Sequence, residues 1–193
     1  MVLAYVIVLL IVIAILLRRD LTAIGRLPFR GGWMLGGLVV GLFFIQAVWV
    51  LFVPGQSAMQ MALLTISQVG LVLLVLINHH LPGAKIFALG IILNILVMVA
   101  NGGWMPLTPD MYHFVHPDRV VTVGERPLNS KNIILPRSDT RFWILSDIIP
   151  VSLPWRNTAV SLGDVLLAVG AAQFIFQASA KKASHPLNQP PVR

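Results

Sequence analysis

Long apolar runs separated by short polar segments dominate this chain. Five runs are of roughly membrane-spanning length and are almost free of charge, at residues 1–17, 33–53, 58–78, 86–104 and 160–178. An α-helix rises about 1.5 Å per residue, so about 20 apolar residues cross a hydrocarbon core of about 30 Å. The pattern predicts an all-α integral membrane protein, a single membrane domain over residues 1–180 with about five transmembrane helices.

The polar segment at residues 105–159 is too long to be a simple connection between two helices. Residues 119–123 and 132–135 flank a turn-forming segment and can form a small hairpin. Residues 140–150 combine a capping residue with spaced apolar side chains, which predicts an interfacial helix lying on the membrane surface. The tail at 181–193 is rich in proline and base, and we expect it to be disordered.

Charge orients the predicted helices. Only 11% of residues are charged, against about 25% in soluble domains, yet the net charge is +7. The segments on one side of the five helices hold eight bases and one acid, whereas the other side, which is the long loop together with Asp164, holds six of each. The excess of bases belongs on the cytoplasmic side. The N-terminus is therefore predicted outside, the loop extracytoplasmic, and the C-terminus and tail inside.

The distribution of charge also indicates which partners to expect. The basic side faces anionic lipid, so the high pI of about 10.9 needs no nucleic acid to explain it. We expect the lipid bilayer, and a membrane protein partner or a second copy of the chain, as partners. The predicted location is the plasma (inner) membrane of a bacterium, as a multi-pass protein.

Small and amide residues recur inside the predicted helices. Small residues four positions apart let two helices approach closely, and amides can form hydrogen bonds between helices. The alternative interpretation is a polar path for a transported substrate. The residues concerned are Gly36, Gly37, Gly41, Gln46, Gln68 and Asn94.

The loop carries one candidate metal site. The chain has no cysteine, which excludes thiolate ligands. Two histidines three residues apart, each flanked by a carboxylate, can bind zinc or a similar ion. The four residues are Asp110, His113, His116 and Asp118. They could equally be ordinary loop residues, and no cofactor is expected elsewhere.

Two acids form a candidate catalytic pair. Asp147 lies in the predicted interfacial helix and Asp164 opens the last predicted span. Two carboxylates can share a proton and divide the acid and base roles in water activation. The alternative is structural, because Ser161 and Asp164 have the spacing of a capping box.

Parts of the chain resemble two known families. Asn101-Gly-Gly-Trp-Met-Pro106 and Ser161-Leu-Gly-Asp164 resemble an uncharacterised family of bacterial polytopic membrane proteins, which implies no activity. The half from Ile86 to Ala178 resembles the C-terminal half of lipoprotein signal peptidase, an aspartyl membrane enzyme. That resemblance implies Asp147 and Asp164 as the catalytic pair.

Three functions remain open at this point. The first is a non-catalytic accessory or assembly component, or a module that binds lipid in the outer leaflet. The second is an aspartyl membrane hydrolase using Asp147 and Asp164, so whether the chain is an enzyme stays undecided. The third is a small transporter whose path passes Gln46, Gln68 and Asn94.

Overall fold

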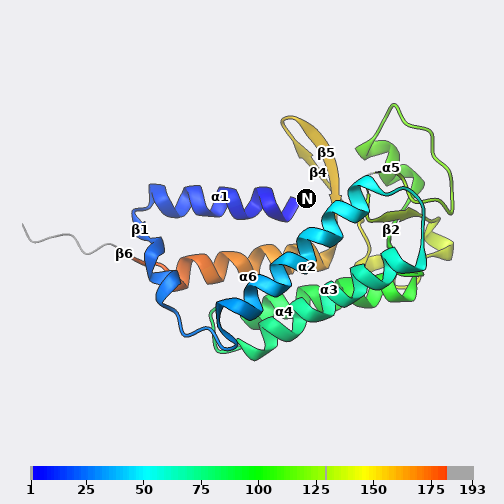
Figure 1. Ribbon diagram of the computed structural model, residues 1–193. Helices are drawn as coiled ribbons and strands as arrows, with labels where there is room; N and C mark the ends of the chain where they lie inside the picture. The colour runs from blue at the N-terminus through cyan, green and yellow to red at the C-terminus, as the bar shows by residue number, and fades with distance from the viewer. Residues whose placement is uncertain (1, 129, 182–193) are drawn as a thin grey trace, which may run out of the picture.

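The computed structural model describes residues 2–128 and 130–181, and most of them are helical (Figure 1). Each of the five apolar runs forms a helix whose ends lie within four residues of the predicted ones, which confirms their positions. The described residues contain the long helices α1 (Val2–Leu16), α2 (Gly32–Phe52), α3 (Ala58–Ile77), α4 (Ala84–Ala100) and α6 (Leu162–Ala178). The tail predicted to be disordered lies, from residue 182, outside the described residues.

Within the described residues, α3 is the helix long and apolar enough to cross a membrane by length and composition, with a mean hydropathy of 2.2. Three shorter apolar helices accompany it, at Leu3–Leu16, Ala84–Ala100 and Leu162–Ala178. Large apolar side chains on several helices are exposed, including Phe44 at 68% and Val99 at 58%. The fold is therefore largely helical with membrane-compatible surfaces, while five spans and their orientation stay predictions.

The closest helix pair in the fold is α4 with α6, and glycines on both helices make their contact possible. A Cβ atom on Gly90 would lie 2.7 Å from the carbonyl oxygen of Gly163. A Cβ atom on Gly170 would lie 2.7 Å from the backbone nitrogen of Phe87. Backbone meets backbone at these points, so the two helices approach as only small residues allow. α3 packs on the other side of α4, α1 packs on α6, and α2 packs on α3.

Local sequence fixes where the helices begin. Ser57 and Gln60 form a complete capping box at the start of α3, and Ser161 and Asp164 form one at the start of α6. The short helix α5 (Pro109–Val115) begins with the Thr108 side chain accepting a hydrogen bond from the Met111 backbone. The capping interpretation of Ser161 and Asp164 is therefore confirmed.

The helix bundle has two chemically different ends. At one end β1 (Arg19–Asp20) pairs antiparallel with β6 (Ala180–Lys181), and β1 leads into the 3-10 helix η1 (Leu21–Arg26). The Asn78 side chain bonds the backbone of Arg30 at this same end. We call it the basic end. The opposite end carries residues 101–161 and is called the loop end (Figure 1).

The predicted interfacial helix at residues 140–150 is wrong. Only a 3-10 turn, η3 (Trp143–Leu145), forms there, and a second short turn, η2 (Arg137–Asp139), precedes it. The strands β4 (Ile149–Leu153) and β5 (Arg156–Val160) then form an antiparallel hairpin. Pro150 lacks a backbone N–H, so a helix through this segment would lose a hydrogen bond, whereas a two-stranded hairpin has edges where proline is tolerated.

The predicted hairpin between residues 119–123 and 132–135 is wrong as well. The later segment forms β3 (Asn132–Ile134), which pairs in parallel with β2 (Met105–Leu107) at the end of α4. The fold is thus not purely helical, because three two-stranded sheets accompany the helices in the described part of the chain. A pair of parallel strands joins segments far apart in sequence, so no local turn pattern predicts it.

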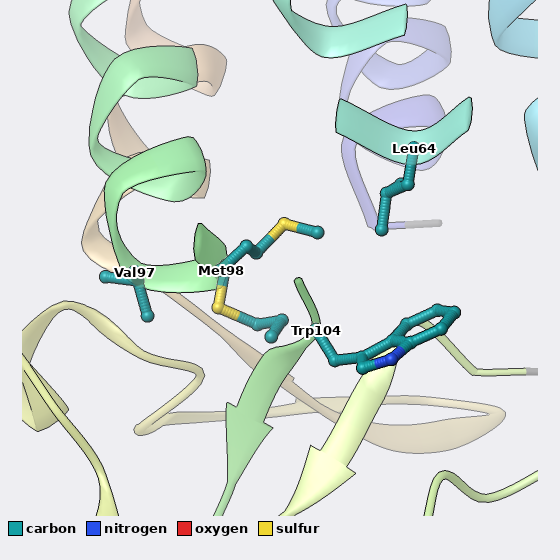
Figure 2. Close-up of a cluster of buried hydrophobic side chains, with 5 residues drawn as sticks. Leu64, Val97, Met98 and Trp104 are labelled. Atoms are coloured by element: carbon teal, nitrogen blue, oxygen red, sulfur yellow. The ribbon is translucent and has the colours of Figure 1, made fainter. Parts of the chain in front are cut away.

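A small apolar core joins the loop end to the helices. Leu64 of α3 and Val97 and Met98 of α4 pack against Trp104 and Met105, which precede and open β2 (Figure 2). A second cluster lies farther out and contains Leu107, Tyr112 and Ile134. These contacts attach β2, and with it β3, rigidly to the ends of α3 and α4.

The glycine contact between α4 and α6 gives a first prediction. Replacing Gly90 by alanine should lower the stability by about 1–3 kcal/mol, because the new methyl group overlaps the Gly163 backbone. Gly70→Ala is the matched control, since a Cβ atom on Gly70 of α3 meets nothing within 4 Å. Thermal unfolding of the detergent-solubilised protein, followed by circular dichroism, measures both. Equal unfolding temperatures for the two variants would contradict the close packing of α4 on α6.

Candidate functional site

A cluster of polar side chains lies where the loop end meets α4 and α6. Lys131, just before β3, stands beside the two predicted acids, and its Nζ lies 4.0 Å from Oδ2 of Asp164. Asp147 is only 3% exposed. We call this cluster the polar junction. It consists of Asn94, Lys131, Asn132, Asp147, Ser161 and Asp164.

On the helix side of the junction, three residues form a closed set of hydrogen bonds. The Asn94 amide donates to Oδ1 of Asp164 at 3.0 Å, and the Ser161 hydroxyl donates to Oδ1 of Asn94 at 2.8 Å. The Ser161 backbone nitrogen donates to Oδ2 of Asp164 at 3.3 Å. Both oxygens of Asp164 are therefore engaged in positioning the start of α6 against α4.

On the loop side, Asp147 is held by β3. The Asn132 amide donates to Oδ2 of Asp147 at 2.8 Å, and the Ser130 hydroxyl fixes that amide by donating to its oxygen at 2.8 Å. The other carboxyl oxygen of Asp147, Oδ1, is buried and has no hydrogen-bond partner among the described residues. An unpaired buried acceptor costs about 1–3 kcal/mol, which makes it the most unusual polar atom of the site.

The electrostatics of the junction follow from burial and from the lysine. Burial raises the pKa of Asp147, the Lys131 ammonium offsets part of that effect, and the Asp164 carboxylate adds to it. Burial disfavours the ammonium of Lys131, but Asp164 and Asp147 outweigh burial, so the pKa of Lys131 is raised. Lys131 is thus charged at neutral pH.

A cavity of about 60 Å³ lies next to the junction and is lined by Asp147, Tyr112, His116 and Thr158, among others. Its volume leaves room for several water molecules, each of which needs about 10–15 Å³. Burial, followed by the positive charges of Arg119 and Arg156, lowers the pKa of His116, so its ring is neutral at pH 7. The cavity is therefore lined by a buried acidic residue and by a neutral imidazole.

This geometry differs from a proton-sharing pair of acids. Within the described residues no hydrogen bond joins the carboxyl groups of Asp147 and Asp164. Lys131 interacts electrostatically with both. In an aspartyl dyad the two carboxylates lie about 3 Å apart and share one proton. The catalytic assignment of Asp147 and Asp164 stays a prediction, and the arrangement favours a structural role.

Arg126 is a central residue that the sequence interpretation missed. Its guanidinium donates to the carbonyl oxygens of Val53 and Gly55 at 2.6 Å each and to that of Ser130 at 2.8 Å. It also lies 4.8 Å from the centre of the Trp104 ring. Arg126 thereby caps the C-terminal end of α2 and ties the loop to the turn between α2 and α3. An arginine in a loop gives no sequence signal for this role.

The predicted metal ligands lie in and just after α5. Asp110 and His113 are in the helix, His116 caps it, and Asp118 follows. Among the described residues, no group of three or more His, Asp, Glu or Cys side chains is close enough to hold a metal ion. The structure therefore does not bring these four residues together as a ligand set.

The predicted packing residues fall into three groups. Cβ atoms on Gly36, Gly37 and Gly41 would meet no atom of the described residues within 4 Å, so these positions make no close helix contact there. The Gln68 amide lies 3.4 Å from the sulfur of Met98, and Asn94 belongs to the polar junction. The Gln46 side chain lies outside the described residues. Gln68 and Asn94 thus contact neighbouring helices rather than line a common polar path.

Comparison with known proteins identifies a family but no activity. A sequence profile described as a family of unknown function, DUF5317, matches residues 26–176. An uncharacterized protein of Thermotoga maritima is 36% identical over 121 residues, which span 59% of this chain and 61% of that protein. No solved structure matches the chain. These findings confirm the prediction of an uncharacterised family, and they give no support to the resemblance to lipoprotein signal peptidase.

The raised pKa of Asp147 predicts a pH effect on stability. The folded protein binds the proton of this carboxyl more tightly than the unfolded chain, whose Asp pKa is about 3.9. The resulting stabilisation is complete below that value and is lost as the pH rises through the folded-state pKa. The parent should therefore lose stability relative to Asp147→Asn as the pH is raised from about 4.

Thermal unfolding of both proteins across pH measures this difference. Asp139→Asn, at an exposed carboxyl, controls for the loss of one acid. A parent that instead gains stability over Asp147→Asn with rising pH would mean that Lys131 stabilises the carboxylate more than burial destabilises it.

Proposed function

We propose that this chain, which belongs to the family of unknown function DUF5317, is a non-catalytic accessory component of a bacterial plasma membrane. Five helices cross the bilayer, with the N-terminus outside and the C-terminus inside, and α2 docks against a membrane helix of a partner protein. Residues 1–180 form one membrane domain.

The observation that carries the proposal is the unoccupied face of α2. This helix packs on α3, yet the positions of Gly37 and Gly41 face open space. Large apolar side chains flank them, among them Met34 at 89% and Leu38 at 60% exposed. Glycines four residues apart with apolar neighbours are the pattern by which transmembrane helices associate through close backbone contact. Since this chain leaves the pattern unused, a helix of another protein is its natural occupant.

The polar junction supports a non-catalytic role. Asp164 caps α6 and binds Asn94, Lys131 lies beside the acids, and the acids do not share a hydrogen bond. The bond between Asn94 and Asp164 joins α4 to α6, and the ion pair of Lys131 with Asp164 joins the loop end to α6. A loop held in this way presents a fixed outer surface to a partner, which suits an assembly component.

The two ends of the bundle support the membrane placement. Arg19, Arg30 and Lys181 belong to segments that hydrogen bonds bring together at the basic end. Residues 101–161 at the loop end carry six bases and five acids, and Asp164 at the start of α6 makes the numbers equal. A bilayer with its cytoplasmic face at the basic end satisfies the distribution of positive charge.

The absence of native cysteine makes the topology directly testable. Val120, 88% exposed at the loop end, and His79, exposed at the basic end, are each replaced by cysteine. A membrane-impermeant maleimide should label the Val120→Cys protein in intact cells and the His79→Cys protein only after the membrane is permeabilised. Labelling of both in intact cells would refute the membrane-spanning arrangement, and the reverse pattern would invert the orientation.

The docking face is tested by co-purification. Gly37→Leu should release the partner protein that co-purifies with the parent in mild detergent, because the leucine keeps the two helix backbones apart. Gly70→Leu is the matched control, since its position on α3 is also open and lies off the proposed face. Docking through α2 would be contradicted if both variants were monomeric and co-purified with equal amounts of the partner protein. Loss of a dimer instead of a second protein would identify the partner as another copy of this chain.

A further inference from the structure

An apolar chamber of about 610 Å³ opens at the basic end of the helix bundle. It exists because neighbouring helices pack on different partners: α1 lies along α6, whereas α2 lies along α3 (Figure 1). Its walls come from α1, η1, α2, α3, α4 and α6. Cavities that hold small molecules have volumes of about 300–1,000 Å³, so the chamber is large enough for a ligand of that size.

Glycines create much of this space. Gly25, Gly32, Gly36, Gly83 and Gly170 all line the chamber. Cβ atoms on Gly32 and Gly36 of α2 would meet no other atom within 4 Å, so the empty volume begins at the helix backbone. Most of the remaining lining residues are apolar, including Phe29, Phe87 and Phe174, and the polar ones are Arg30 and Asn78. Such walls attract an apolar chain and offer no partner to a polar one.

Among the described residues that line the chamber, Arg30 is the charged one. The buried side chain of Asn78 accepts a hydrogen bond from the Arg30 backbone nitrogen at 2.8 Å and donates to its carbonyl oxygen at 3.1 Å. Close to Arg30 in sequence, the carbonyl oxygen of Pro28 lies 3.1 Å from Nε2 of His80. These bonds fix the backbone of Arg30 and leave its guanidinium exposed, without an ion-pair partner among the described residues.

A ligand complementary to these features combines an apolar chain with an anionic group. Free guanidinium groups bind phosphate oxygens in a forked geometry. Arg26, exposed on η1, adds a second positive charge at the same end. We infer that the chamber binds an acyl chain of an anionic phospholipid and that Arg30 binds the phosphate of its headgroup. This inference rests on the proposed membrane placement, and it places lipid binding at the basic end instead of the outer leaflet.

The inference is tested on the purified chain in detergent. Phosphatidylglycerol and a diacylglycerol with identical acyl chains, which lacks the phosphate, are titrated separately, and bound lipid is counted by native mass spectrometry. The parent should prefer phosphatidylglycerol by about fivefold, the ratio that one basic residue near an anionic lipid supplies. Equal affinity for both lipids would overturn the role of Arg30.

Two variants with matched controls test the apolar chamber and Arg30 separately. Gly36→Leu places a side chain in the chamber from a position where a Cβ atom meets nothing within 4 Å, and it should weaken both lipids at least tenfold, whereas Gly70→Leu should not. Arg30→Gln keeps the backbone bonds to Asn78 and should abolish only the preference for phosphatidylglycerol. Arg119→Gln, exposed at the loop end, should leave that preference intact.

The outcomes also distinguish this inference from the proposed function. Equal lipid binding by Gly36→Leu and Gly70→Leu would overturn the chamber as a lipid site. If Gly36→Leu instead converts a dimer into a monomer, the occupant is a second copy of the chain and the inference is again overturned. The assay needs neither a partner protein nor a known topology, so a failure of docking through α2 or of the cysteine labelling leaves its result intact.

Discussion

The close approach of α4 and α6 is the contact on which the other parts of this protein depend. Gly90 and Gly163 bring the two backbones together near the loop end, and Gly83 and Gly170 do so near the basic end. Because lipid is as apolar as the side chains of these helices, burial of apolar surface contributes little to helix association in a bilayer. Close packing and hydrogen bonds must supply the stability instead. The bonds among Asn94, Ser161 and Asp164 add that second contribution at the point where the backbones are closest.

The loop end is attached to this helix pair by charge and by a small core. Lys131 reaches Asp164 from the loop, while Trp104 and Met105 pack against residues of α3 and α4. Arg126 ties the same loop to the end of α2 through carbonyl oxygens. Among the described residues, Oδ1 of Asp147 is a buried carboxyl oxygen without a hydrogen-bond partner, and it lies close to these contacts. The junction thus holds the loop in one position while it leaves one acceptor beside a small cavity.

The helices that are not part of this pair leave surfaces open. α1 and α2 pack on different helices, and the space between them becomes the apolar chamber. Glycines of α2 border both open surfaces, since Gly36 lines the chamber and Gly37 lies on the unoccupied face. The proposed docking of a partner helix and the inferred binding of a lipid would therefore use neighbouring positions of one helix. This arrangement fits a protein that acts through what it binds within the membrane.

The sequence by itself determined the helices and the chemical difference between the two ends. Apolar runs and capping residues such as Ser57 and Ser161 act within a few residues, so helix positions can be read locally. Asp147, Asp164 and Asn94 were also identified, because acids and amides in apolar surroundings stand out.

Only the tertiary structure decided how these parts meet. Lys131 and Arg126 look like ordinary loop bases in the sequence, and β3 pairs with a strand far away in the chain instead of forming a local hairpin. Likewise, Gly90 and Gly163 pack helices within the chain, whereas Gly37 and Gly41, which show the stronger pattern, do not. A glycine permits close approach by anything on its side of the helix. The neighbour that takes this place is set by contacts between segments distant in sequence, which no local pattern records.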